Sequence, residues 1–204
     1  MLLIGLTGSI GMGKSTAAAR FRFNGVPVVD ADALVHALYE GAAVAPIEAA
    51  FPGVTVDGRI DRQKLSALLM ADPAGFKALE AIVHPLVFDT ERRALAEAKA
   101  AGATLAVLEV PLLFETGGDA RVDVTVVVSA TADLQRTRVM ARAGMTAAKL
   151  DAILKRQMND AEKRQKADFV VDTSGDIATT EAQIDAIVVS LRARDGSAFA
   201  KFWA

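Results

Sequence analysis

The sequence predicts an α/β fold in three layers, a doubly wound, mostly parallel five-stranded sheet covered by helices. Five short runs are almost wholly apolar, as is typical of parallel strands buried on both faces. They are residues 2–7, 26–30, 105–110, 122–128 and 169–171. Alanine-rich helical stretches separate them, and the first, second and fourth runs lead directly into such a stretch. This alternation is the βαβ pattern of a doubly wound sheet.

Composition excludes several classes of protein. The 204 residues include no cysteine, which excludes a disulfide framework, a thiolate zinc site and a catalytic cysteine. With 23 basic and 25 acidic residues the net charge is −2, so a globally basic nucleic-acid binder is not expected. No apolar run approaches the roughly 20 residues of a membrane span. We therefore expect a cytoplasmic chain with neither nucleic acid nor membrane as partner.

Two long stretches interrupt the alternation. Residues 31–104 are far more than one crossover helix requires, and Pro52-Gly53, Asp57-Gly58 and Asp72-Pro73 punctuate them as turns. We interpret this stretch as an inserted helical subdomain.

The second stretch, residues 136–166, is strongly basic. It holds nine basic and three acidic residues, and this local excess suggests a polyanion nearby, although a solvated helical face is the alternative. The basic residues are Arg136, Arg138, Arg142, Lys149, Lys155, Arg156, Lys163, Arg164 and Lys166.

Residues 8–15 carry the strongest functional signal. Their sequence, Gly-Ser-Ile-Gly-Met-Gly-Lys-Ser, fits the phosphate-loop pattern G-x-x-x-x-G-K-[ST] at every position, between an expected strand and an expected helix. Glycines allow successive backbone N–H groups to turn inward onto phosphate oxygens, and the helix N-terminus adds its dipole. Lys14 is expected to reach the β- and γ-phosphates, and the Ser15 hydroxyl to coordinate Mg²⁺.

A dinucleotide-binding loop is the first alternative to exclude. Gly11 and Gly13 begin a G-x-G-x-x-G pattern and Asp30 follows about 20 residues on, but the third glycine position is Thr16. Lys14-Ser15 also has no role in that motif.

Acidic residues mark the ends of two expected strands. The second strand is expected to end in Val28-Val29-Asp30-Ala31-Asp32, and carboxylates at i and i+2 share one side of a strand, at the edge where open α/β sheets bind ligands. Such an acid could orient or deprotonate an acceptor hydroxyl or hold magnesium, and Asp32, which precedes a helical run, could instead cap that helix. Glu109 interrupts an apolar run, and a buried carboxylate is costly unless it is ligated or paired. We therefore expect Glu109 to face the metal site.

Three arginines and one histidine complete the candidates. Arg138 and Arg142 stand at i and i+4 on an expected helix and, with Arg136, could close over a γ-phosphate; ordinary surface arginines are the alternative. His84 precedes Pro85, which predicts a broken helix there, with a kink histidine or a ligand contact as the two interpretations. His36, in an amphipathic stretch, is expected to be structural.

Taken together, these motifs resemble the dephospho-CoA kinase family. They run in that family's order over nearly the whole chain, from residue 2 to about 175. Beyond the phosphate loop they are residues 28–32, 57–65, 79–85, 110–115, 156–157 and 167–168. The His84-Pro85 pair and the run 111–115 are the narrowest of them.

The resemblance implies an ATP-dependent phosphotransferase with an alcohol acceptor. Such enzymes phosphorylate the ribose 3′-hydroxyl of dephospho-CoA, which gives coenzyme A and ADP in the last step of coenzyme A biosynthesis. By resemblance Asp32 activates the hydroxyl, assisted by Lys14, Arg138 and Arg142. The nucleotide would lie on Gly8, Gly11, Met12, Gly13, Lys14, Ser15, Thr16, Arg142 and Thr173, with Mg²⁺ at Ser15 and Glu109. The acceptor would contact Asp32, Arg62, Leu65, His84, Pro85, Pro111, Leu112 and Leu113.

The resemblance also implies boundaries. The core would comprise about 1–35, 104–130 and 167–196, the acceptor subdomain about 36–103 and the lid about 131–166, in a monomer or weak homo-oligomer. A nucleoside or nucleotide kinase shares the same loop and lid and remains the nearer alternative. A regulatory GTPase would need an Asn-Lys-x-Asp run, which the chain lacks.

Overall fold

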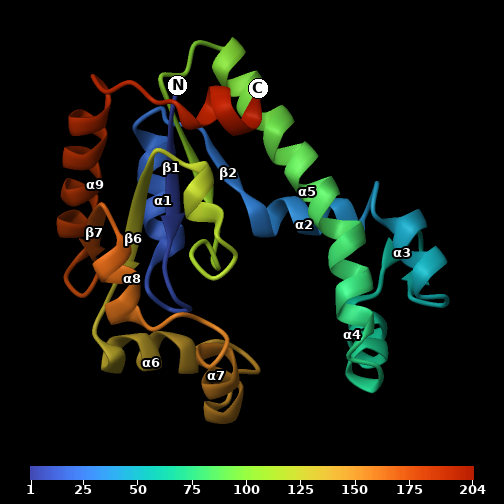
Figure 1. Ribbon diagram of the computed structural model, residues 1–204. Helices are drawn as coiled ribbons and strands as arrows, with labels where there is room; N and C mark the ends of the chain where they lie inside the picture. The colour runs from blue at the N-terminus through green and yellow to red at the C-terminus, as the bar shows by residue number, and fades with distance from the viewer. The chain divides into compact units, whose positions relative to one another are not determined.

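The computed structural model describes all residues, 1–204, and divides the chain into two compact units (Figure 1). The first unit comprises Met1–Val29 and Leu95–Ala204, and the second comprises Asp30–Ala94. The second unit thus starts at the end of one strand and ends inside a long helix.

A five-stranded sheet forms the centre of the first unit. Its strands are β1 Leu2–Thr7, β2 Val28–Asp30, β5 Leu105–Glu109, β6 Val124–Ser129 and β7 Phe169–Asp172. They lie in the order β2-β5-β1-β6-β7, and β1 pairs in parallel with both β5 and β6. All residues of β1, β5 and β6 are buried, which explains their unbroken apolar runs. The predicted fold class is confirmed, with strand bounds shifted by at most two residues.

The first unit also contains helices. They are α1 Lys14–Phe23, α6 Ala132–Met140, α7 Ala147–Leu154, α8 Asp160–Lys166, α9 Ile177–Leu191 and the end of α5, Gly75–Ala100, with a short 3-10 turn η1 at Gly118–Arg121. The buried faces of α1 and α9 join the sheet in one hydrophobic core. Figure 1 shows these two helices lying side by side.

Polar contacts centred on Arg20 join α1 to α9. The Arg20 Nε donates to Asp185 at 2.7 Å, and its Nη1 lies 3.1 Å from Glu181. Asn24 also donates to Asp185, from its Nδ2 at 2.7 Å. These bonds, led by that from Arg20, lower the pKa of Asp185 to about 2.

The second unit is mainly helical, as expected, but also contains a small hairpin. Its helices are α2 Ala31–Tyr39, α3 Val44–Ala50, α4 Arg62–Ala71 and most of α5, and the hairpin strands are β3 Thr55–Val56 and β4 Arg59–Ile60. Asp57 and Gly58 form the turn, both with positive φ. An Asp-Gly pair is the sequence signal for such a hairpin, and interpreting it only as a loop missed the two strands.

The predicted break at His84-Pro85 is wrong. Helix α5 continues through Pro85 for 26 residues. Its neighbours Val83, Leu86 and Val87 contribute to the core of the second unit. Burial of these side chains offsets the roughly 3 kcal/mol that a proline costs inside a helix.

The chain's last turn packs back on the first unit. Residues Phe199–Trp203 form a π-helical turn, η2, in which Trp203 is buried and donates from Nε1 to the Arg121 carbonyl at 2.9 Å. The expected packing of Trp203 on the core is thus observed. No helix of the fold is sufficiently long and apolar to span a membrane.

The α1–α9 contact predicts a specific acid response. Because the folded-state pKa of Asp185 lies near 2, against an ordinary 3.8, its stabilisation is complete above about pH 4 and disappears as pH falls toward 2. Asp185→Asn should therefore lower the melting temperature at pH 6 and lose less additional stability than the parent between pH 4 and pH 2. Thermal melts across this range measure both effects. Asp151→Asn, at an exposed position of α7, is the matched control; identical acid slopes for all three proteins would contradict the assignment.

Candidate functional site

The phosphate loop joins β1 to α1, and its first glycine is required by close packing. A Cβ on Gly8 would lie 2.3 Å from Val128 Cγ2 and 2.8 Å from the Val128 carbonyl oxygen of β6. Gly13 precedes α1 with a φ of +88°, a conformation that side-chain-bearing residues rarely adopt. The path of the loop therefore leaves no room for a side chain at position 8 and would strain one at position 13.

Neighbouring elements hold the loop's backbone by hydrogen bonds. The Ile10 N–H donates to Gln157 Oε1 at 3.1 Å, and the Ile10 carbonyl accepts from Gln135 Nε2 at 2.8 Å. The Met12 carbonyl accepts from the Thr173 hydroxyl at 2.8 Å. Side chains from α6, from the turn after α7 and from the end of β7 thus fix the loop. Gln135 and Gln157 were not among the predicted site residues, because glutamine has no distinctive spacing in the sequence.

The lysine of the loop forms an ion pair with the acid of β5. Lys14 Nζ lies 2.8 Å from Glu109 Oε1, and Glu109 is only 4% exposed. The second oxygen, Oε2, lies 3.8 Å from Arg22 Nη2 of α1. The structure therefore brings Lys14 and Glu109 together, and the buried carboxylate is paired as its position requires. Ser15 and Thr16 occupy the first turn of α1.

The predicted arginine arrangement needs a correction. Helix α6 ends at Met140 and a turn follows, so Arg142 is not on one helical face with Arg138. Gly144, with a φ of +72°, continues this turn. Arg142 and Arg136 are exposed.

Arg138, by contrast, is held next to the phosphate loop. Its Nη2 donates to the Thr173 carbonyl at 2.7 Å and its Nη1 to the Thr173 hydroxyl at 3.1 Å. That hydroxyl in turn bonds Met12. Thr173 is buried, and its hydroxyl bonds both the loop and Arg138.

The segment after β5 adjoins the loop. The Pro111 carbonyl accepts from the Thr7 hydroxyl at the end of β1, at 3.1 Å. Leu113 is fully buried against Gly5 and Gly118, whereas Pro111 and Leu112 remain partly exposed.

In the second unit the two aspartates occupy different positions from those expected. Asp30 ends β2 and is also the N-cap of α2, where its Oδ1 accepts from the Ala33 N–H at 3.1 Å. Asp32 is exposed in the first turn of the helix. The interpretation of the pair as one side of a strand is therefore wrong, since the strand ends at Asp30. The cap that was considered for Asp32 is supplied by Asp30.

A polar cluster surrounds Arg62 of α4. Its Nη2 lies 2.8 Å from His36 Nδ1, and its guanidinium lies 5.4 Å from the centroid of the Tyr39 ring. Because arginine only donates, His36 accepts through Nδ1. His36 of α2 is thus an exposed partner of Arg62.

The remaining residues predicted to bind the acceptor differ in how far they are buried. Leu65 is buried in the core of the second unit, while His84 and Pro85 are exposed on α5.

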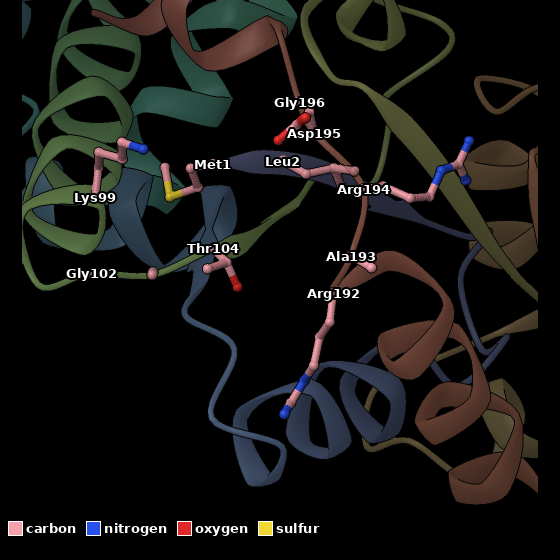
Figure 2. A pocket seen from close by; sticks show the side chains of 11 residues that line it. Met1, Leu2, Lys99, Gly102, Thr104, Arg192, Ala193, Arg194, Asp195 and Gly196 are labelled. Atoms are coloured by element: carbon pink, nitrogen blue, oxygen red, sulfur yellow. The ribbon is translucent and has the colours of Figure 1, made fainter.

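A separate cavity of about 310 Å³ lies at the opposite edge of the sheet, next to Leu2 and Thr104, where β1 and β5 begin. Lys99, Arg192 and Arg194 also line it, but Figure 2 shows the two arginine side chains extending in different directions. They do not converge on one anion. The phosphate loop, at the carboxyl end of β1, is therefore the better candidate site.

The geometry at that loop is suited to phosphate chemistry. The glycine-rich backbone of the loop, the start of α1 and Lys14 meet there, and Arg138 is held next to the loop. Such groups bind a polyphosphate and stabilise charge that develops on it.

Comparison with known proteins agrees with this geometry. The family model described as dephospho-CoA kinase matches residues 2–179. The dephospho-CoA kinase of Nitrobacter winogradskyi is 57% identical over 93% of this chain and 96% of its own. That of Mesorhizobium japonicum is 54% identical over 97% of this chain and 100% of its own.

Solved structures share the fold. The crystal structure of TT1252 from Thermus thermophilus has a TM-score of 0.80 at 40% identity, covering 93% of this chain and 97% of that one. Dephospho-CoA kinase from Campylobacter jejuni has a TM-score of 0.70 at 22% identity over 93% and 96% of the two chains. The match along the sequence and the geometry of the phosphate loop have one explanation: the chain belongs to the dephospho-CoA kinase family.

Proposed function

We propose that this chain transfers the γ-phosphoryl group of ATP to the ribose 3′-hydroxyl of dephospho-CoA, giving coenzyme A and ADP. The observation that carries this proposal is the family match across residues 2–179, which includes both the phosphate loop and the second unit. In the reaction the bond between the γ-phosphorus and the bridging oxygen breaks, and a bond from the 3′-oxygen forms. The hydroxyl proton leaves to a base.

At the nucleotide end, the residues of the loop bind and orient the phosphates. Backbone N–H groups of the loop other than those of Ile10 and Met12, which bond within the protein, hold the phosphate oxygens together with the N-terminus of α1. Lys14 neutralises the charge shared by the β- and γ-phosphates. In the free protein Lys14 is paired with Glu109, and we expect it to exchange this partner for the phosphates. Arg138 and Arg142 then stabilise charge on the transferred group, and Thr173 lies beside the nucleotide.

The residues at this edge also fit a magnesium ion. A hydroxyl at Ser15 and a carboxylate at Glu109 are the oxygen ligands that Mg²⁺ accepts alongside waters and substrate phosphates. When Lys14 exchanges Glu109 for the phosphates, the buried carboxylate keeps only Arg22, 3.8 Å from its second oxygen, and a magnesium ion would add to its charge balance. No group of three or more His, Cys, Asp or Glu side chains forms a separate metal cage. Magnesium would neutralise the transferred phosphoryl group.

At the acceptor end, Asp32 orients the 3′-hydroxyl and accepts its proton. The exposure of Asp32 in the first turn of α2 leaves its carboxylate available, since the capping bond is made by Asp30. Arg62 and the exposed His84-Pro85 pair bind the rest of dephospho-CoA, with Leu65 supporting α4 from the core. Pro111, Leu112 and Leu113 contribute from the first unit. We place this activity in the cytoplasm and assign it to a monomer or weak homo-oligomer.

The acceptor is tested by Mg²⁺-dependent ADP release. Dephospho-CoA, adenosine, AMP and CMP are supplied separately, and mass spectrometry identifies the product. We expect turnover with dephospho-CoA alone and a product heavier by one phosphate. Turnover with adenosine, AMP or CMP in its place would instead identify a nucleoside or nucleotide kinase.

Loss of the loop lysine should remove most of the activity. Lys14→Ala deletes a preorganised contact to the transferred group, so turnover should fall by about 10²–10³-fold. Glu109 keeps Arg22 as a nearby cation, so the variant should still fold. Steady-state kinetics measure the loss, and a thermal melt confirms folding. Full activity in a folded Lys14→Ala protein would overturn the phosphate-loop assignment.

Substitution of Asp32, the proposed base, should affect catalysis but not nucleotide binding. Asp32→Asn keeps the size of the side chain and leaves the Asp30 cap in place, so kcat should fall strongly while ATP affinity stays almost unchanged. Asp61→Asn is a matched control, because Asp61 is the cap of α4 in the same unit. An equal loss of ATP binding in Asp32→Asn would make Asp32 a metal ligand or a structural residue.

A further inference from the structure

One lysine of the basic stretch lies inside the protein. Lys163, in the middle of α8, is 0% exposed, although the sequence pattern placed it with the lid cations. Its Nζ lies 2.9 Å from Glu115 Oε1 and donates to the Pro111 carbonyl at 3.3 Å. A buried ammonium is costly unless it is paired, so these two contacts determine its place.

The partner of Lys163 also receives a second donor. Glu115 Oε1 accepts from the Met158 N–H at 2.7 Å. Met158 directly follows Gln157 in the chain. Gln157 accepts from the Ile10 N–H of the phosphate loop. Glu115 Oε2 is buried and has no hydrogen-bond partner, so Oε1 makes every polar contact of this carboxylate.

These contacts meet at the segment after β5. Its carbonyl at Pro111 receives one hydrogen bond from Lys163 and one from the Thr7 hydroxyl of β1. Its acid, Glu115, is anchored by Lys163 of α8 and by the N–H of Met158, which lies between α7 and α8. The segment Pro111–Glu115 is therefore fixed at both ends. The same carboxylate also bonds Met158, whose neighbour Gln157 accepts a hydrogen bond from the phosphate loop.

We propose that Lys163 and Glu115 are positioning residues that hold the segment Pro111–Glu115 in the conformation that binds the acceptor. The proposal rests on the proposed function, in which Pro111, Leu112 and Leu113 contact dephospho-CoA. Neither Lys163 nor Glu115 touches the substrates, since the lysine is enclosed and the carboxylate is committed to Lys163 and Met158.

The test separates positioning from stability. Lys163→Met removes the ammonium but keeps an unbranched chain of similar length, and leaves Glu115 buried without its cation. We expect KM for dephospho-CoA to rise about tenfold, with kcat within about threefold and KM for ATP within about twofold of the parent. The melting temperature should also fall.

A double variant distinguishes the two effects. Lys163→Met with Glu115→Gln removes the unpaired charge and keeps an oxygen at Oε1 for Met158, so the melting temperature should recover. Because nothing then donates to Pro111 from α8, KM for dephospho-CoA should remain high. Recovery of KM together with stability would show that the pair acts only on stability, and so would overturn the proposal.

The control keeps the same helix and the same chemical change. Lys166→Met lies one turn further along α8, where the ammonium is exposed and reaches only the Phe114 ring, 5.9 Å from its centroid. Its kinetics should match the parent. If the parent protein itself fails to use dephospho-CoA, the proposed function fails; if the parent is active and Lys163→Met leaves KM unchanged, the positioning role alone fails.

Discussion

The buried carboxylate at the end of β5 constrains the whole nucleotide site. Glu109 lies in a strand that is otherwise apolar, where it requires a cation, and Lys14 at the start of α1 supplies one at 2.8 Å. This ion pair joins the end of one strand to the loop that follows its neighbour. In the proposed function the phosphates need the same lysine, so nucleotide binding would alter the charge balance of the core and leave Arg22 as the cation 3.8 Å from Glu109.

Much of this site could be predicted from the sequence, because its signals are local. Unbroken apolar runs placed β1, β5 and β6 within two residues, and the spacing of Gly8, Gly13 and Lys14 placed the phosphate loop. The cost of burying a charge indicated that Glu109 must have a partner; a metal site was expected there, and the structure pairs the carboxylate with Lys14. These inferences need only strand periodicity, glycine geometry and the chemistry of one buried acid.

The errors at Pro85 and Lys163 have a different cause, because both depended on packing between distant segments, whereas the error at Asp32 depended on where one strand ends. His84-Pro85 predicts a break, but the apolar neighbours of Pro85 keep α5 continuous. Asp30 rather than Asp32 caps α2 because the strand runs directly into the helix. Lys163 was grouped with exposed cations, since nothing in its local sequence reveals the acid 48 positions earlier at Glu115. Local sequence patterns predict the helices and strands, and tertiary contacts determine which polar groups pair with one another.

The burial of Lys163 also restricts how this region can evolve. Glu115 and Lys163 are far apart in the sequence, yet either one alone leaves an unpaired charge inside the first unit. A lineage that loses the pair must pass through that costly intermediate or change both codons at nearly the same time. The two positions should consequently be inherited as a linked pair, either acid with base or both uncharged, and intermediates should be purged by selection.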